Sequence, residues 1–124
     1  MSEEKYVLIV EDDPFYSSIY KTKVEKEGLR SVLVHDGAAA LQAIRKERPA
    51  VVVLDLIMPG KDGFQVLQEL KADPAFKDLV VLVLSNLSQD EDIKRVMGMG
   101  ATEYLIKSNV PLQEVIMKIR SYIS

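Results

Sequence analysis

The chain has 124 residues, of which 48% are hydrophobic, so it has the usual size of one domain and can bury a core. Its 16 basic and 19 acidic residues give a net charge of -3, which offers no electrostatic reason to expect direct nucleic-acid binding. The lack of cysteine excludes disulfides and thiolate metal sites. The apolar runs are far shorter than the roughly 20 residues of a membrane span. We therefore expect a cytoplasmic protein that does not bind membranes, with a single domain over residues 1–124.

Five apolar runs alternate with five amphipathic segments along the chain. The apolar runs, which we expect to be strands, cover residues 6–10, 31–34, 51–54, 79–84 and 103–106. Three of them, at 6–10, 51–54 and 79–84, are continuously apolar, as is typical of parallel strands covered on both faces. The segments that follow each run have the periodicity and capping residues of helices.

The first three expected helices have clear start signals. Asp13 precedes Pro14, a capping residue followed by a proline at the first helical position, and Gly28 ends this helix. Asp36 and Asp62 precede the second and third helices in the same way.

The last two expected helices are marked by a capping box and by an apolar stripe. Ser88 and Glu91 have the spacing of a capping box at the start of the fourth helix, and Gly100 ends it. The stripe of the fifth helix consists of Leu112, Val115, Ile116, Ile119 and Ile123.

This alternation predicts an α/β fold, a flavodoxin-like (βα)5 doubly wound sandwich with a five-stranded parallel sheet in the order 2-1-3-4-5. In such sheets, sites form at the carboxyl ends of the strands, near the point where the strand order reverses. Polar residues follow four of the strands there: Glu11 and Asp12 after the first, Asp55 after the third, Ser85 after the fourth and Lys107 after the fifth.

These polar residues are suited to phosphoryl chemistry. Three carboxylates about 4–6 Å apart would repel one another by about 3–4 kcal/mol per pair at an effective dielectric near 20, unless one is protonated or a cation binds. Oxygen ligands without cysteine favour Mg²⁺ or Mn²⁺, with Ca²⁺ as an alternative. Asp55 can attack phosphorus and form an acyl phosphate, while Lys107 and Ser85 bind the phosphoryl oxygens.

Four segments in order resemble the receiver domain of two-component response regulators, in particular the chemotaxis regulators, which can stand alone. They are Val-Glu-Asp-Asp at 10–13, Leu-Asp-Leu-Ile-Met-Pro-Gly-Lys-Asp-Gly at 54–63, Leu-Ser at 84–85, and Gly-Ala-Thr-Glu-Tyr-Leu-Ile-Lys at 100–107. The resemblance covers essentially the whole chain. It implies that Asp55 is the phospho-acceptor, that Ser85 and Lys107 bind the phosphoryl group, and that Ser85 and Tyr104 form the switch.

The resemblance also implies a metal site and a set of partners. The metal, Mg²⁺ or Mn²⁺, would be bound by Asp12, by Asp55, by the backbone carbonyl of Ile57, and by Glu11 through a water molecule. The phosphoryl donor would be a sensor histidine kinase or a phosphotransfer protein. The output would be a downstream effector that binds the fourth helix, fifth strand and fifth helix, or a homodimer that forms on phosphorylation. The protein would not be an enzyme beyond its own phosphotransfer and slow autodephosphorylation.

Two other functions remain open on this fold. One is a pseudo-receiver, a protein-interaction module that works without phosphorylation. The other is an enzyme, although the acidic loop after the first strand lacks the Ser/Thr/Gly-rich phosphate cradle of a flavodoxin. An aspartyl phosphatase would need a second aspartate shortly after Asp55, where Leu56 and Ile57 stand.

The chain departs from the family pattern at two positions. Ser108 follows Lys107 where most receivers have a proline, often after a cis peptide bond. A cis bond before serine costs about 2.5–4 kcal/mol, so the bond is either trans or held cis by packing. Asn86 follows Ser85 where the family usually has a small residue, and we expect it to crowd the phosphoryl site or to hydrogen-bond into it. The apolar Ile57 predicts slow loss of the phosphoryl group, as does Leu87.

Overall fold

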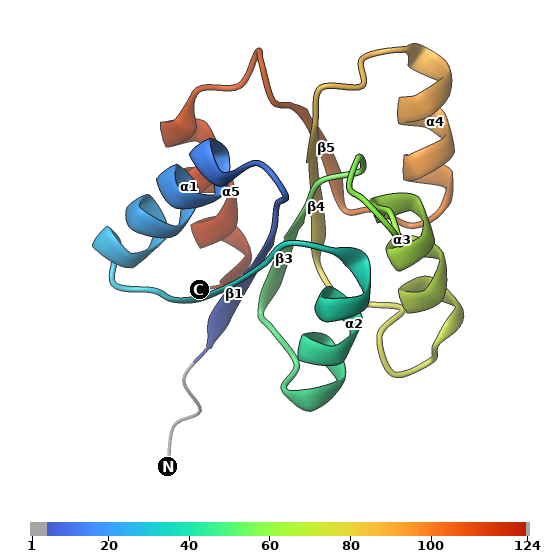
Figure 1. Ribbon diagram of the computed structural model, residues 1–124, viewed down its shortest axis with the longest axis horizontal. Coiled ribbons are helices and arrows are strands. Elements are labelled where there is room, and N and C mark those ends of the chain that lie inside the picture. The colour runs from blue at the N-terminus through green and yellow to red at the C-terminus, as the bar shows by residue number, and fades with distance from the viewer. Residues whose placement is uncertain (1–4, 124) are drawn as a thin grey trace.

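The structure, a computed structural model, describes residues 5–123 as a parallel sheet of five strands flanked by helices (Figure 1). The strand order is β2-β1-β3-β4-β5, so the predicted fold class and strand order are confirmed. The elements are β1 (Tyr6–Val10), α1 (Pro14–Lys26), β2 (Arg30–Val34), α2 (Gly37–Lys46), β3 (Val51–Leu54), α3 (Gly63–Ala72), β4 (Val81–Ser85), α4 (Asp90–Gly98), β5 (Glu103–Ile106) and α5 (Leu112–Ile123). No helix of these described residues has the length and apolar character needed to cross a membrane.

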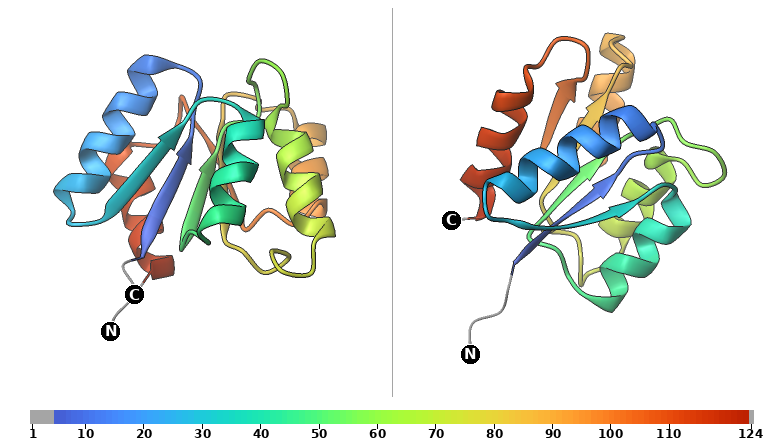
Figure 2. Two further views of the ribbon diagram at one scale, coloured as in Figure 1. Left: turned by 60° about the horizontal axis from the view of Figure 1, so that its bottom comes forward. Right: turned by 60° about the vertical axis from the view of Figure 1, so that its left-hand side comes forward.

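The sheet lies between two layers of helices. Helices α1 and α5 cover one face, and α2, α3 and α4 cover the other (Figures 1 and 2). In β1, Val7 and Ile9 pack in the core under α1 and α5, whereas Leu8 and Val10 pack in the core under the other three helices. Because both faces are covered, the strand is apolar at every position, as the sequence indicated.

The predicted caps of the first three helices are confirmed. The side chains of Asp13, Asp36 and Asp62 each accept a hydrogen bond from a backbone N–H of the first helical turn. Gly28 follows α1 with a φ of 81°, a left-handed conformation that glycine adopts without strain.

The predicted start of α4 is wrong. The helix begins at Asp90 with Gln89 at the N-cap, and no side chain caps it, so the capping box expected from Ser88 and Glu91 does not form. The three acidic residues of the first turn, which include Asp92, instead place negative charge where the helix dipole is positive. Strand β4 also differs from the expected range: it starts at Val81 and includes Ser85.

Strand pairing brings the polar residues to one edge of the sheet. Val10 pairs with Leu54 across β1 and β3, and Ser85 pairs with Ile106 across β4 and β5. The backbone N–H of Asp55 then donates to the carbonyl of Val10 at 3.0 Å. The residues that follow β1 and β3 therefore leave the sheet side by side, and those that follow β5 leave from the same end of the sheet, with β4 between β3 and β5.

Candidate functional site

A buried lysine joins two of the predicted carboxylates at this edge of the sheet. The Lys107 Nζ lies 2.6 Å from Glu11 Oε1 and 3.4 Å from Asp55 Oδ2. The side chains are 6%, 3% and 10% exposed respectively, so water screens these charges little. The structure thus brings together three residues that the sequence assigned to the site from three different strand ends.

Burial and charge act in opposite directions on this cluster. Burial raises the pKa of the Glu11 carboxyl, and the hydrogen bond from Lys107 opposes the rise. For Lys107, burial by itself would lower the pKa, but the hydrogen bond to Glu11 and the charge of Asp55 outweigh it and raise the pKa. Lys107 therefore stays protonated and provides the positive charge that the buried carboxylates need.

The position of Asp55 depends on a close contact with the start of α3. A Cβ atom on Gly63 would lie 2.3 Å from the Asp55 carbonyl oxygen and 2.6 Å from the Cα of Leu56. Only glycine lets α3 begin this close to the backbone of the predicted phospho-acceptor. In the sequence, Asp62 and Gly63 have the pattern of an ordinary turn, and nothing in it indicates this contact.

The two predicted switch residues meet at the backbone of Leu87. The Leu87 N–H donates to Ser85 Oγ at 3.2 Å, and the Tyr104 hydroxyl donates to the Leu87 carbonyl at 2.5 Å. Ser85 is fully buried, and Tyr104 is partly buried. The β4–α4 loop therefore connects the buried hydroxyl to the aromatic residue of β5.

The two departures from the family pattern contact each other. Asn86 Oδ1 accepts a hydrogen bond from the Ser108 backbone N–H at 2.8 Å. Residues 5–123 contain no cis peptide bond, so the bond between Lys107 and Ser108 is trans. The Asn86 oxygen is thus engaged with the β5–α5 loop.

Tyr16 is a neighbour of Lys107 that the sequence did not indicate. The Lys107 Nζ lies 4.7 Å from the centre of the Tyr16 ring, within the range of a cation–π interaction. Tyr16 in turn stacks on Tyr20, one helical turn further along α1, with ring centres 5.9 Å apart. The spacing of the two tyrosines indicates an aromatic face on α1, but no motif shows that Lys107 lies against it.

The predicted metal ligands fit a hard cation by their chemistry, since all of their donor atoms are oxygens. In the described part of the chain, however, no three acidic or histidine side chains are gathered into a group that could hold a metal ion. Asp12 is exposed, and Glu11 is paired with Lys107. The ammonium group of Lys107 thus contacts two of the three predicted carboxylate ligands, Glu11 and Asp55.

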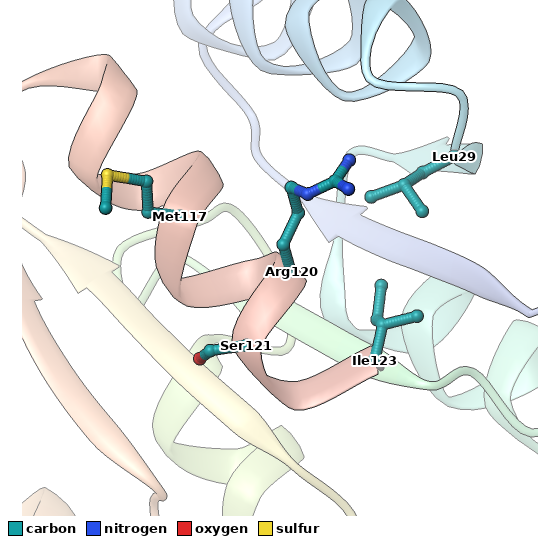
Figure 3. Close-up of a pocket in the computed structure, with 5 residues that line it drawn as sticks. All are labelled: Leu29, Met117, Arg120, Ser121 and Ile123. Atoms are coloured by element: carbon teal, nitrogen blue, oxygen red, sulfur yellow. The ribbon is translucent and has the colours of Figure 1, made fainter.

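A separate cavity of about 250 Å³ lies beside α5 (Figure 3). It is lined by Leu29, Met117, Arg120, Ser121 and Ile123. Leu29 precedes β2 at the amino end of the sheet, whereas Asp55 follows β3 at the carboxyl end. This cavity is therefore distinct from the charged cluster.

Comparison with known proteins identifies the family of the chain. Residues 7–120 match the family described as response regulator receiver domain. The chain belongs to that family. It is 34% identical over 121 residues to the probable transcriptional regulator ycf27 of Porphyridium aerugineum, covering 98% of this chain and 48% of the relative. It is 30% identical over 115 residues to the DNA-binding response regulator MtrA of Mycolicibacterium smegmatis, and this match covers 93% of this chain and 49% of MtrA. This receiver chain spans about half the length of these relatives.

Solved receiver structures have the same fold. The Francisella response regulator 1452 receiver domain aligns with a TM-score of 0.88 at 28% identity, covering 96% of both chains. The phosphorylated cyanobacterial phytochrome response regulator RcpA aligns with a TM-score of 0.82 at 29% sequence identity, and the alignment covers 96% of this receiver and 91% of RcpA. The Mn²⁺-bound response regulator Rcp1 aligns with a TM-score of 0.82 at 27% sequence identity, and the alignment covers 94% of this chain and 90% of Rcp1.

Proposed function

We propose that this receiver domain, over residues 1–124, is a switch that accepts a phosphoryl group on Asp55. The donor is the phosphohistidine of a sensor histidine kinase or phosphotransfer protein. The observation that carries the proposal is the protonated, buried Lys107 held against Glu11 and Asp55 at the carboxyl edge of the sheet. A buried cation beside a carboxylate is suited to bind the dianionic group that this carboxylate receives.

The transfer is an attack by a carboxylate oxygen of Asp55 on phosphorus. The bond between phosphorus and the donor nitrogen breaks, and its electron pair leaves with the imidazole, so that an aspartyl phosphate forms. Lys107 binds one phosphoryl oxygen as a point charge. The Ser85 oxygen already accepts from the Leu87 N–H, and its own O–H remains able to donate to a second phosphoryl oxygen.

A divalent cation completes the proposed site. Asp12, Asp55 and the backbone carbonyl of Ile57 would bind Mg²⁺ or Mn²⁺, with Glu11 acting through a water molecule. When bound, the cation neutralises charge on the phosphoryl oxygens. The Mn²⁺-bound state of Rcp1 supports a metal of this kind. Because Lys107 and the cation would share the same carboxylates, Glu11 and Asp55 set the balance between the two.

The proposed output surface is formed by α4, β5 and α5. Phosphorylation would draw Ser85 toward the phosphoryl group, and Leu87 bonds to both Ser85 and Tyr104, so the change would reach β5. The partner there is a downstream effector protein or a second copy of the chain. The apolar Ile57, with 59% of its surface exposed, places no polar group that could orient water, which supports slow loss of the phosphoryl group.

The test is the intact mass of the protein after incubation with acetyl phosphate, with Mg²⁺ or with EDTA. We expect a gain of one phosphoryl group only with Mg²⁺, and no gain in Asp55→Asn. Asp13→Asn is the matched control, because asparagine also caps helices and Asp13 serves only as the cap of α1. If neither acetyl phosphate nor a histidine kinase labels the wild-type protein, the chain is a pseudo-receiver.

A further inference from the structure

The loops that carry Ser85 and Lys107 are tied together by a side chain. The last backbone hydrogen bond between β4 and β5 runs from the Lys107 N–H to the Ser85 carbonyl at 2.8 Å. One residue further along each strand, Asn86 Oδ1 accepts from the Ser108 N–H, also at 2.8 Å. A side chain thus extends the connection between the strands beyond the point where β4 ends.

We propose that Asn86 is a positioning residue for Lys107. By holding the Ser108 amide, it fixes the backbone from which Lys107 extends, relative to Ser85 and Asp55. The bond needs a residue with a backbone N–H at position 108, and proline has none. Asn86 and Ser108 are therefore a matched pair, and each is of use only with the other. This inference rests on the function proposed above.

The loop that carries Asn86 is itself held in place. The next residue, Leu87, donates its N–H to Ser85 and accepts from the Tyr104 hydroxyl. The loop is thus held from β4 and from β5 at adjacent residues, and Asn86 projects from it to Ser108. A hydrogen bond to a fixed loop restrains its partner, whereas a bond to a mobile loop would move with it.

Lys107 needs such restraint when the phosphoryl group arrives. Its ammonium is held by Glu11 and Asp55 in the structure, and it must shift toward a phosphoryl oxygen during transfer. A lysine side chain has many rotamers, so its reach is defined only if its backbone is fixed. The bond from Ser108 to Asn86 fixes that backbone without involving the ammonium group.

The test is a double-mutant cycle on the rate of phosphorylation by acetyl phosphate with Mg²⁺. Asn86→Leu has a similar volume and removes the acceptor, whereas Ser108→Pro removes the donor. We expect each to slow phosphorylation at saturating acetyl phosphate by about threefold to tenfold, the effect of losing one hydrogen bond. The double variant should be no slower than the slower single variant. Ser108→Ala keeps the N–H and should stay within about twofold of wild type.

A second measurement separates positioning from general stability. The Ser108 amide proton should be protected from hydrogen exchange in the wild type and lose that protection in Asn86→Leu, with the melting temperature almost unchanged. A wild-type phosphorylation rate in Asn86→Leu would overturn the proposal, and so would independent, multiplying effects in the double variant. If the wild type accepts no phosphoryl group at all, the proposed function fails instead.

Discussion

Two of the lysine–carboxylate pairs in the receiver have similar lengths but contrasting surroundings. Lys107 lies 2.6 Å from Glu11 at the carboxyl edge of the sheet, and the two side chains are only 6% and 3% exposed. Lys118 of α5 lies 2.8 Å from Glu103 of β5, with side chains 35% and 27% exposed. The distances barely differ, so the environment determines what each pair does.

The buried pair is expensive to form, and the surface pair is not. Removing two charges from water costs several kcal/mol per ion, which mutual attraction only partly offsets, so a buried pair is a poor device for stability. The surface pair keeps much of its hydration, so it contributes little to stability. A buried pair next to Asp55 is therefore better explained by phosphoryl binding than by folding.

The largest effect should come from removing the buried cation. Lys107→Met leaves Glu11 and Asp55 buried without a counter-charge, and should lower the free energy of unfolding by about 3–5 kcal/mol and abolish phosphorylation. Adding Glu11→Gln should recover much of the stability but none of the phosphorylation. Urea unfolding and intact mass measure the two quantities. Lys118→Met is the control, and equal losses of stability in the two lysine variants would show that burial does not distinguish the two pairs.

The next largest effect should be stabilisation by Mg²⁺, which should depend on the proposed metal ligands and not on the surface pair of Lys118 and Glu103. At about 100 times its dissociation constant, Mg²⁺ should add about 2.7 kcal/mol to the free energy of unfolding. Asp12→Ala should lose this gain, because Asp12 is the exposed carboxylate proposed as a direct ligand. Glu103→Gln should keep it in full. Thermal unfolding with Mg²⁺ and with EDTA gives the answer, and an unchanged wild-type melting temperature would count against the site.

A smaller effect should come from the Tyr16 ring that contacts the buried Lys107. Tyr16→Leu removes the ring that lies 4.7 Å from Lys107 Nζ, and should cost about 0.5–2 kcal/mol of folding stability and slow phosphorylation. Tyr16→Phe keeps the ring and should behave like the wild type in both respects. The comparison of the two variants under identical conditions isolates the cation–π contact, and equal behaviour of Leu and Phe at this position would show that the ring is only packing.

What sequence reasoning could predict follows from the range of the interactions. Helix caps such as Asp13 and Asp62 act within three residues. The alternation of strands and helices predicts a doubly wound parallel sheet, for which 2-1-3-4-5 is a common order of five strands. The carboxyl-edge rule then brings Asp55 and Lys107 together from opposite halves of the chain. These predictions succeeded because each depends on local pattern plus one topological rule.

The remaining features depend on side-chain packing between elements. The pairing of Lys107 with Glu11 places a cation of the protein itself against buried negative charge, and it joins residues that follow β5 and β1. The contact of Tyr16 with that lysine joins α1 to β5, and the bond from Ser108 to Asn86 joins two loops. No spacing within one segment encodes such contacts. The capping box at Ser88 does not form, and the helix starts one residue further along the chain than the local pattern suggests.

The smallest expected effect belongs to the surface pair, and its dependence on pH has the opposite sign from that of the buried carboxyl. The hydrogen bond from Lys118, followed by that from Tyr122, lowers the pKa of Glu103 below its usual 4.5. The contribution of Glu103 to stability is therefore present above pH 4.5 and is lost as the pH falls through the lowered value.

At pH 7, Glu103→Gln should cost less than about 1 kcal/mol, and this difference from wild type should vanish in acid. Burial raises the pKa of Glu11, so its charged form is disfavoured in the fold and its contribution to stability falls as the pH rises above 4.5. Urea unfolding of Glu103→Gln and Glu11→Gln between pH 3 and pH 7 measures both trends in the presence of EDTA. Parallel trends would mean that burial does not set the difference between the two pairs.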